Sequence, residues 1–256
     1  MTRRGVPELF DTRAATVNLA RIENSPFIVG LGFVAGFIDV FGFLTFNGLL
    51  AAHVTGNVVF TAIDLASGRD PIFMKIAALP IFCAAVVMSA WFIGSLMERK
   101  RNPLVPALAL QAGLIAACMA CVLLIPAGAV PNDAAVLAGS VLALIAMALH
   151  NTFMRLVLND LPPTTVLTGN ITHVLSHTAA LMFGLSSIRR SDIRSHGLGR
   201  QARRMLLTIV SFVAGTLAAA FGTRWLGAAA LLMPIAALLG LIPFSREATR
   251  NAPPHG

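Results

Sequence analysis

The residue whose chemistry stands out first is Asp39, the thirteenth residue of the apolar run from Phe27 to Phe46. A run of this length can cross a bilayer as a helix, and inserting an ionisable side chain at its centre costs about 2.5–3.5 kcal/mol. Gly32, Gly36 and Asp39 recur at helical spacing, so this face is expected to pack on another helix and not on lipid. Two roles stay open for Asp39: a proton or cation site, or a structural partner for a neighbouring helix.

Two copies of the tripeptide Thr-Gly-Asn place further polar groups inside apolar runs. They are Thr55, Gly56 and Asn57 in the first copy, and Thr168, Gly169 and Asn170 in the second. Glycine is a poor helix former, and the side chains of Thr and Asn compete for backbone hydrogen bonds. Each tripeptide is therefore predicted to open a helix at membrane depth, where protein or a water-filled cavity must satisfy the backbone.

Four more polar residues are candidates for the same site. His53 precedes the first tripeptide, and Thr165 precedes the second. Asn151 and Arg155 lie four residues apart, so they share a helix face. Arg155 lies near the end of its run and can extend to the membrane surface; the alternatives are that it pairs with Asp39 or holds an anionic substrate.

Histidines and cysteines do not form a recognisable metal site in the sequence. His173 and His177 lie four residues apart, but no Glu or Cys completes a ligand set. Cys118 and Cys121 have CxxC spacing without a second pair, so we interpret them as small buried residues. We therefore expect no metal and no cofactor.

Long apolar helices must position these groups. Hydrophobic residues make up 57% of the chain, its mean hydropathy is +0.80, and only 12% is charged, about half of the roughly 25% in soluble proteins. This composition excludes a soluble enzyme, a disordered chain and a disulfide scaffold, and it predicts an all-α, multi-pass membrane protein. The apolar runs cover residues 27–46, 49–66, 72–97, 104–125, 134–158, 164–185, 205–221 and 226–244.

Six of these runs qualify, or nearly so, as membrane-crossing helices of about 20 residues. The runs 49–66 and 164–185 contain the tripeptides and are predicted to be broken or re-entrant helices. An offset of 113 residues superposes the tripeptides and places the first four runs on the last four. Three crossings per half would make the two repeats inverted, an arrangement typical of secondary transporters.

This interpretation divides the chain into four parts. They are a cytoplasmic tail over 1–26, repeat one over 27–125, repeat two over 134–244 with a basic cytoplasmic linker over 186–204, and a C-terminal tail over 245–256. With six crossings and the N-terminus inside, fifteen basic residues lie inside and three outside. Eight crossings would give fourteen against four, so the positive-inside rule slightly favours the inverted arrangement.

The net charge of +8 lies mainly in short loops and tails between the apolar runs. Basic residues at these places are typical of contacts with anionic lipid headgroups at the cytoplasmic face, and not of nucleic-acid binding. We expect an inner-membrane protein of a bacterial cell with a cytoplasmic N-terminus. The sequence leaves the oligomeric state open, including a homo-oligomer.

Three segments resemble the YoaK family, a family of bacterial multi-pass inner-membrane proteins of unassigned function. They are Gly-Phe-Ile-Asp-Val-Phe-Gly-Phe-Leu from Gly36, His-Val-Thr-Gly-Asn from His53, and Thr-Thr-Val-Leu-Thr-Gly-Asn from Thr164. The resemblance covers almost the whole chain. It implies an inner-membrane location and this topology, and it supplies no substrate.

The favoured hypothesis is a small-molecule secondary transporter or permease, not an enzyme, with its site between the two tripeptides at the repeat interface. Asp39 would couple ions, while the Thr and Asn groups would line the site. One alternative is an intramembrane enzyme that uses Asp39 and His53 as acid and base, although no nucleophile or metal set supports it. The other is a non-transporting lipid-binding or assembly protein with a basic cytoplasmic face.

Overall fold

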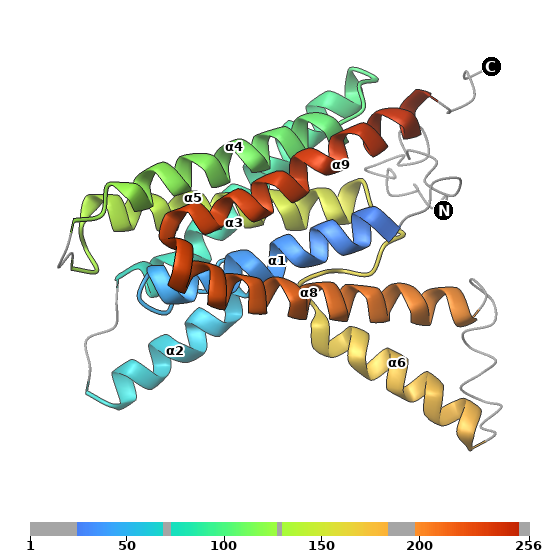
Figure 1. Cartoon of the computed structure of the whole chain (residues 1–256), viewed down its shortest axis with the longest axis horizontal. Helices are drawn as coiled ribbons and strands as arrows, with labels where there is room; N and C mark the ends of the chain where they lie inside the picture. The colour runs from blue at the N-terminus through green and yellow to red at the C-terminus, as the bar shows by residue number, and fades with distance from the viewer. Residues whose placement is uncertain (1–24, 69–72, 127–129, 184–197, 251–256) are drawn as a thin grey trace, which may run out of the picture.

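The computed structural model consists of helices joined by loops, without strands, in the residues that it describes, which are 25–68, 73–126, 130–183 and 198–250 (Figure 1). The long helices are α1 (Ser25–Thr45), α3 (Phe73–Glu98), α4 (Leu104–Leu123), α5 (Ala134–Leu156), α8 (Leu198–Leu226) and α9 (Leu232–Arg250). Two shorter helices are α2 (Val54–Ala66) and α6 (Leu167–Met182), and η3 (Gly227–Leu231) is a 3-10 turn. The predicted all-α class is confirmed.

Five helical stretches are long and apolar enough to cross a membrane. Four are the single helices α1, α3, α4 and α5, and the fifth, residues 201–245, folds back on itself at η3. Gly227 lies at the reversal with a φ of +57°, a conformation that glycine adopts without steric cost. The fifth stretch thus supplies two antiparallel helices, α8 and α9, which confirms the six predicted long helices (Figure 1).

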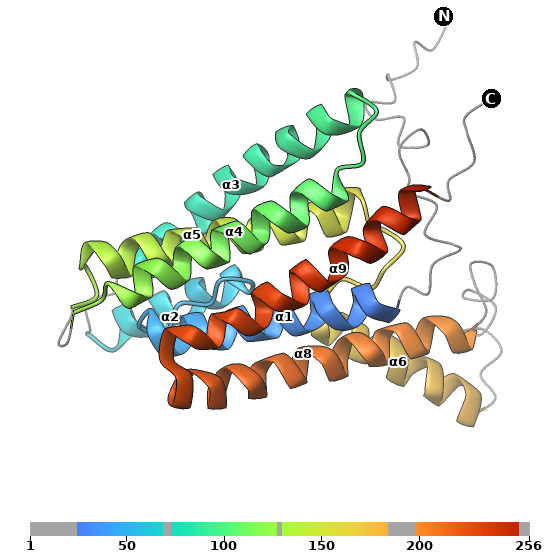
Figure 2. The same ribbon diagram turned by 45° about the horizontal axis from the view of Figure 1, so that its top comes forward.

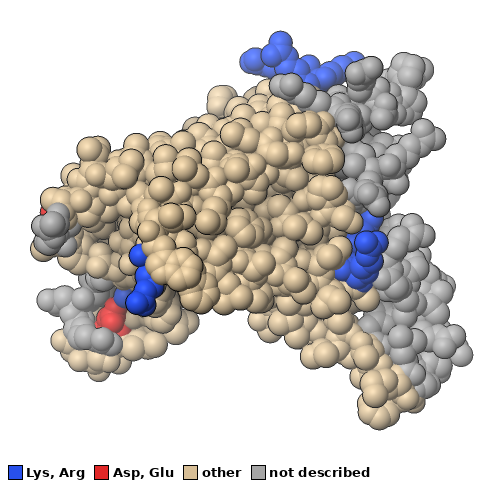
Figure 3. Space-filling view, in the orientation of Figure 1, with Lys and Arg blue, Asp and Glu red and all other residues tan. Residues whose placement is uncertain are grey.

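The long helices alternate in direction along the molecule. Figures 1 and 2 show α1, α4 and α8 running one way, and α3, α5 and α9 running the other. The start of α1, the end of α3, the start of α8 and the end of α9 therefore lie at one end of the molecule. On the face shown in Figure 3, Lys and Arg lie towards the ends, with a broad uncharged band between them. This distribution is the one that a bilayer requires.

Helices α2 and α6 are re-entrant. Each begins near the middle of the molecule, and the chain reaches that point through residues 46–53 or 157–166, which we call the first and second entry segments (Figure 1). Each helix then returns towards the end from which its entry segment came. At about 1.5 Å per residue, helices of 13 and 16 residues are shorter than the roughly 30 Å hydrocarbon core. The re-entrant alternative of the sequence prediction is the one observed.

The predicted position of the break was wrong by a few residues. The tripeptides do not open α2 and α6; they lie in or next to their first turns, and the irregular backbone is upstream in the entry segments. A first helical turn has backbone N–H groups without intrahelical partners, so poor helix formers cost little there. The basic linker was also predicted too long, because α8 begins at Leu198 and includes its last residues. Residues 1–24 and the linker residues 186–197 lie outside the described part of the chain.

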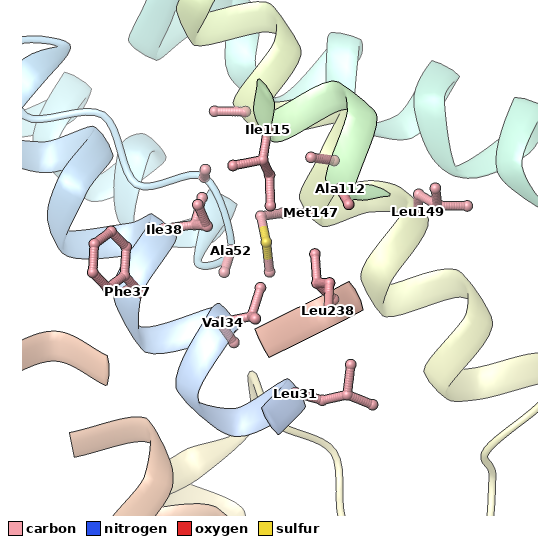
Figure 4. Close-up of a cluster of buried hydrophobic side chains, with 14 of the residues drawn as sticks. Leu31, Val34, Phe37, Ile38, Ala52, Ala112, Ile115, Met147, Leu149 and Leu238 are labelled. Carbon is pink, nitrogen blue, oxygen red and sulfur yellow. The ribbon is translucent and has the colours of Figure 1, made fainter. Parts of the chain in front are cut away.

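The first helix of each half packs on helices of the other half. Helix α1 contacts α8 and α9, and α5 contacts α3 and α4. Two glycines bring the backbones of α1 and α8 together: a Cβ at Gly36 would lie 2.2 Å from the carbonyl oxygen of Phe212, and one at Gly215 would lie 2.1 Å from that of Phe33. Figure 4 shows the buried apolar cluster beside this contact, where Ala52 of the first entry segment meets Val34, Met147 and Leu238.

Candidate functional site

Asp39 fixes the end of the first entry segment at the start of α2. The residue is buried. Oδ1 accepts hydrogen bonds from the backbone N–H of Ala52 at 2.6 Å and of His53 at 3.3 Å, and Oδ2 is hydrogen-bonded to Nδ1 of the His53 ring. The carboxylate thus satisfies backbone groups that have no partner within α2, as an irregular segment at membrane depth requires.

The His53 ring joins the two halves of the molecule. Nδ1 contacts Asp39, the ring also approaches the backbone of Thr165 in the second entry segment, and its edge packs on Phe212 of α8, with ring centroids 5.6 Å apart. The His53 side chain is 31% exposed and that of Asp39 is 5% exposed. The partly exposed His53 side chain thus contacts a carboxylate that is almost fully buried.

The asparagines of the two tripeptides hold the two entry segments in corresponding ways. Nδ2 of Asn57 donates to the carbonyl of Leu50 at 2.7 Å, and Nδ2 of Asn170 donates to the carbonyl of Pro163 at 2.9 Å. Both pairs are seven residues apart, and both partners are related by the 113-residue offset. Asn57 also accepts from the N–H of Leu50 at 2.8 Å. Proline has no N–H, so the second segment lacks this return bond.

These two amides therefore have structural partners, whereas the neighbouring candidates are more open. Thr55, Thr168 and Gly169 are exposed, and Gly56 is partly buried. A Cβ at Gly56 would lie 2.6 Å from a methyl of Leu50, so the glycine permits the close return of the entry segment. The polar residues predicted from the sequence thus form two groups. Asn57 and Asn170 are buried and hold the entry segments, whereas Thr55, Thr168 and Gly169 are exposed at the starts of α2 and α6.

The second entry segment is held by neutral side chains of α5. Oδ1 of Asn151 accepts from the hydroxyl of Thr165 at 2.8 Å, and Nε2 of His150 lies 2.9 Å from the hydroxyl oxygen of Thr164. His150 is fully buried, and its Nδ1 lies 3.1 Å from the amide nitrogen of Gln111 on α4. Asn151 and Thr165 were predicted from the sequence, whereas His150 and Gln111 were missed.

The remaining candidates do not join this cluster. Arg155 is exposed in the last turn of α5, and Asp39 is hydrogen-bonded to His53 and Ala52 and not to Arg155. Within the described residues, no three His, Cys, Asp or Glu side chains are placed to share a metal ion. The side chain of His177 is outside the described part of the structure.

The arrangement combines a carboxylate–imidazole pair with two helix starts. A buried carboxylate beside an imidazole can take up and release a proton. The starts of α2 and α6 carry partial positive charge, and neither has a side-chain cap. Because His53 is the N-cap of α2 and contacts Thr165 just before α6, the pair lies where the two starts approach each other.

The comparisons with known proteins agree with the family resemblance seen in the motifs. Residues 27–243 match the family described as protein of unknown function, DUF1275. No curated protein and no solved structure matches the chain. Since the match covers both entry segments and all the long helices except the first two residues of α1 and the end of α9, the chain belongs to the DUF1275 family.

Proposed function

We propose that this protein is a small secondary transporter or permease of the bacterial inner membrane. The observation that carries the proposal is the His53 ring, which joins Asp39 of the first half to Thr165 of the second where two re-entrant helices begin. Discontinuous helices at corresponding places in two halves are the strongest structural pointer to a transport site. The solute would bind beside His53, near the exposed residues Thr55 and Thr168.

An inverted repeat underlies this proposal. Three observations support it: α1 and α5 run antiparallel, each packs on helices of the other half, and the Asn57 and Asn170 bonds recur at one offset. Two such halves can rock about a central site and open it to either side in turn. The basic end, with Arg99 to Arg101 and the start of α8, would face the cytoplasm and its anionic lipid headgroups.

Asp39 would couple proton binding to the position of the first entry segment. Its two oxygens accept from Ala52 and from the backbone and ring of His53. A proton on the carboxyl group removes acceptor capacity and weakens these bonds. The first entry segment is then freer to move, whereas the second is held by the neutral groups of His150 and Asn151.

Proton movement in vesicles tests the proposal. Purified protein is reconstituted into liposomes that contain a pH-sensitive dye, and small metabolites and ions are added outside in turn. We expect at least one solute to drive proton movement in the wild type and not in Asp39→Asn. Asp64→Asn is the matched control, because Asp64 lies near the end of α2 and pairs with Lys75 at 3.1 Å, away from His53.

Two other outcomes would replace the proposal. Chemical conversion of an added compound, lost in Asp39→Asn and His53→Gln, would favour the intramembrane enzyme. Thermal stabilisation by lipids alone, with no solute-driven proton movement, would favour the lipid-binding or assembly protein.

A further inference from the structure

We infer that His150, through Thr164, is a positioning residue that holds the second entry segment against His53 and so completes the Asp39–His53 site from the other half. The inference deepens the proposed function and rests on it for its consequence in transport. His150 itself touches neither Asp39 nor His53 in any hydrogen bond that the structure describes, so its effect passes through the chain of contacts below.

The hydrogen-bond partners of His150 fix the form of its ring. The amide nitrogen of Gln111 can only donate, so Nδ1 of His150 accepts, and the ring proton is on Nε2. Nε2 then donates to the hydroxyl oxygen of Thr164 at 2.9 Å. Gln111 and His150 are 0% exposed and Thr164 is 2% exposed, and a buried ring between an amide and a hydroxyl is held in its neutral form. His150 is therefore suited to hold a segment and not to carry a proton.

Thr164 transmits this position to the site through one peptide bond. Its neighbour Thr165 donates its hydroxyl to Asn151 at 2.8 Å, and the backbone of Thr165 lies beside the His53 ring. His150 and Asn151 are adjacent on α5, and they bind adjacent residues of the entry segment. Releasing Thr164 should therefore shift the Thr165 backbone relative to His53.

The spacing supports a common design with different chemistry in the two halves. Asp39 and His53 are fourteen positions apart, and so are His150 and Thr164 and also Asn151 and Thr165. In the first half the bond joins two ionisable groups, and in the second the two bonds join threonine hydroxyls to an imidazole and to an amide. The second segment is thus a fixed reference against which the proton-dependent first segment can move.

Nitrogen NMR of histidine side chains tests the inference without requiring a known solute. The full-length protein, labelled with ¹⁵N-histidine, is placed in lipid nanodiscs, and the His53 and His150 signals are assigned from their loss in His53→Gln and His150→Gln. In Thr164→Val we expect the Nε2 signals of both His150 and His53 to move, because each ring loses or weakens an acceptor. Thr164→Ser keeps the hydroxyl and should leave both near their wild-type positions.

Thr152→Val is the matched control. Thr152 is buried on α5 and donates its hydroxyl to the carbonyl of Ala148 within the same helix, so its loss should leave the His53 signal in place. If Thr164→Val does not fold, Thr164→Ala makes the same comparison without the bulk of the valine side chain. A His150 signal that moves while the His53 signal stays fixed would overturn the inference and leave His150 as a residue of local packing.

Vesicle assays on the same variants separate this inference from the proposed function. If the His53 and His150 signals both move in Thr164→Val, and if proton movement is slower in this variant but normal in Thr164→Ser, both the positioning role and the transporter are supported. If both signals move in Thr164→Val but the wild-type protein transports no solute, the transporter is refuted and the positioning role of His150 is supported. A fixed His53 signal refutes the positioning role whether or not the vesicles transport.

Discussion

At the scale of residues, the two entry segments are held by side chains of different acidity. Asp39 can lose its acceptor capacity by binding a proton, whereas Asn151 cannot. The 113-residue offset places these two side chains together after a single gap. Under the proposed transport function, this difference would make Asp39 the proton-coupled side chain and leave Asn151 as a fixed one.

Replacing Asn57 by Ala should destabilise the protein more than replacing Asn170 by Ala. The first change removes the partner of both the N–H and the carbonyl of Leu50, and the second removes the partner of the Pro163 carbonyl alone. Each buried group left unsatisfied costs about 1–3 kcal/mol, so the two variants should differ by about that amount. Unfolding of purified protein in nanodiscs measures both, and equal losses would contradict the asymmetry.

The sequence identified most of the side chains that hold the entry segments, but not His150 and Gln111. Asp39 and Asn151 were found because polar groups in apolar runs are costly and therefore usually functional. The same rule applies to His150, which lies in an apolar run beside Asn151 but was not predicted. The fourteen-position spacing of His150 and Thr164, equal to that of Asp39 and His53, is a signal that could have identified it. The partner of Asp39 could not be chosen between Arg155 and His53, because an entry segment that folds back on its own helix leaves no periodic signal in the sequence.

At the scale of elements, helix identity was predictable and helix starts were not. The bounds of α1, α4 and α5 agree with their apolar runs within about two residues, because hydropathy changes sharply at their ends. The start of α2 was misplaced, because residues 49–53 are as apolar as the helix that follows. Whether such residues are coiled or helical depends on partners such as Asp39, which are distant along the chain.

The α1–α8 contact connects helix packing to the site. The backbone oxygen of Phe212 lies against Gly36, and the ring of the same residue packs on His53. Gly36→Ala should therefore destabilise the protein by about 1–3 kcal/mol, because the new methyl would lie 2.2 Å from that oxygen and force the helices apart.

Gly113→Ala is the control for this prediction. Gly113 lies within α4, and a Cβ there has no atom within 4 Å, so alanine should be neutral or stabilising by up to about 1 kcal/mol. Thermal unfolding in nanodiscs compares the two variants. A Gly36→Ala protein as stable as Gly113→Ala would mean that α1 and α8 do not approach as closely as described.

At the scale of the whole molecule, charge and topology agree. Basic residues of the described chain gather at the end where α3 and α5 finish and α8 begins, including Arg99, Lys100, Arg101, Arg155, Arg203 and Arg204. Lys75 and Arg224 lie at the opposite end, where Asp64 and Asp133 offset them. The positive-inside rule therefore predicts that the first of these ends faces the cytoplasm.

Cysteine labelling in intact cells tests this orientation and the re-entrant path together. On a background with Cys83, Cys118 and Cys121 replaced, single cysteines are introduced as Ser67→Cys after α2, Lys100→Cys after α3 and Asp133→Cys before α5. A membrane-impermeant maleimide should label positions 67 and 133 from outside, because α2 returns to the side on which α1 ends. Position 100 should react only after the cells are permeabilised, which also serves as the control for reactivity. External labelling at position 100, with positions 67 and 133 protected, would contradict the predicted orientation. A further cysteine introduced as Asn47→Cys, between α1 and α2, tests the path by itself: a re-entrant α2 keeps positions 47 and 67 on one side, whereas opposite sides would mean that α2 crosses the membrane.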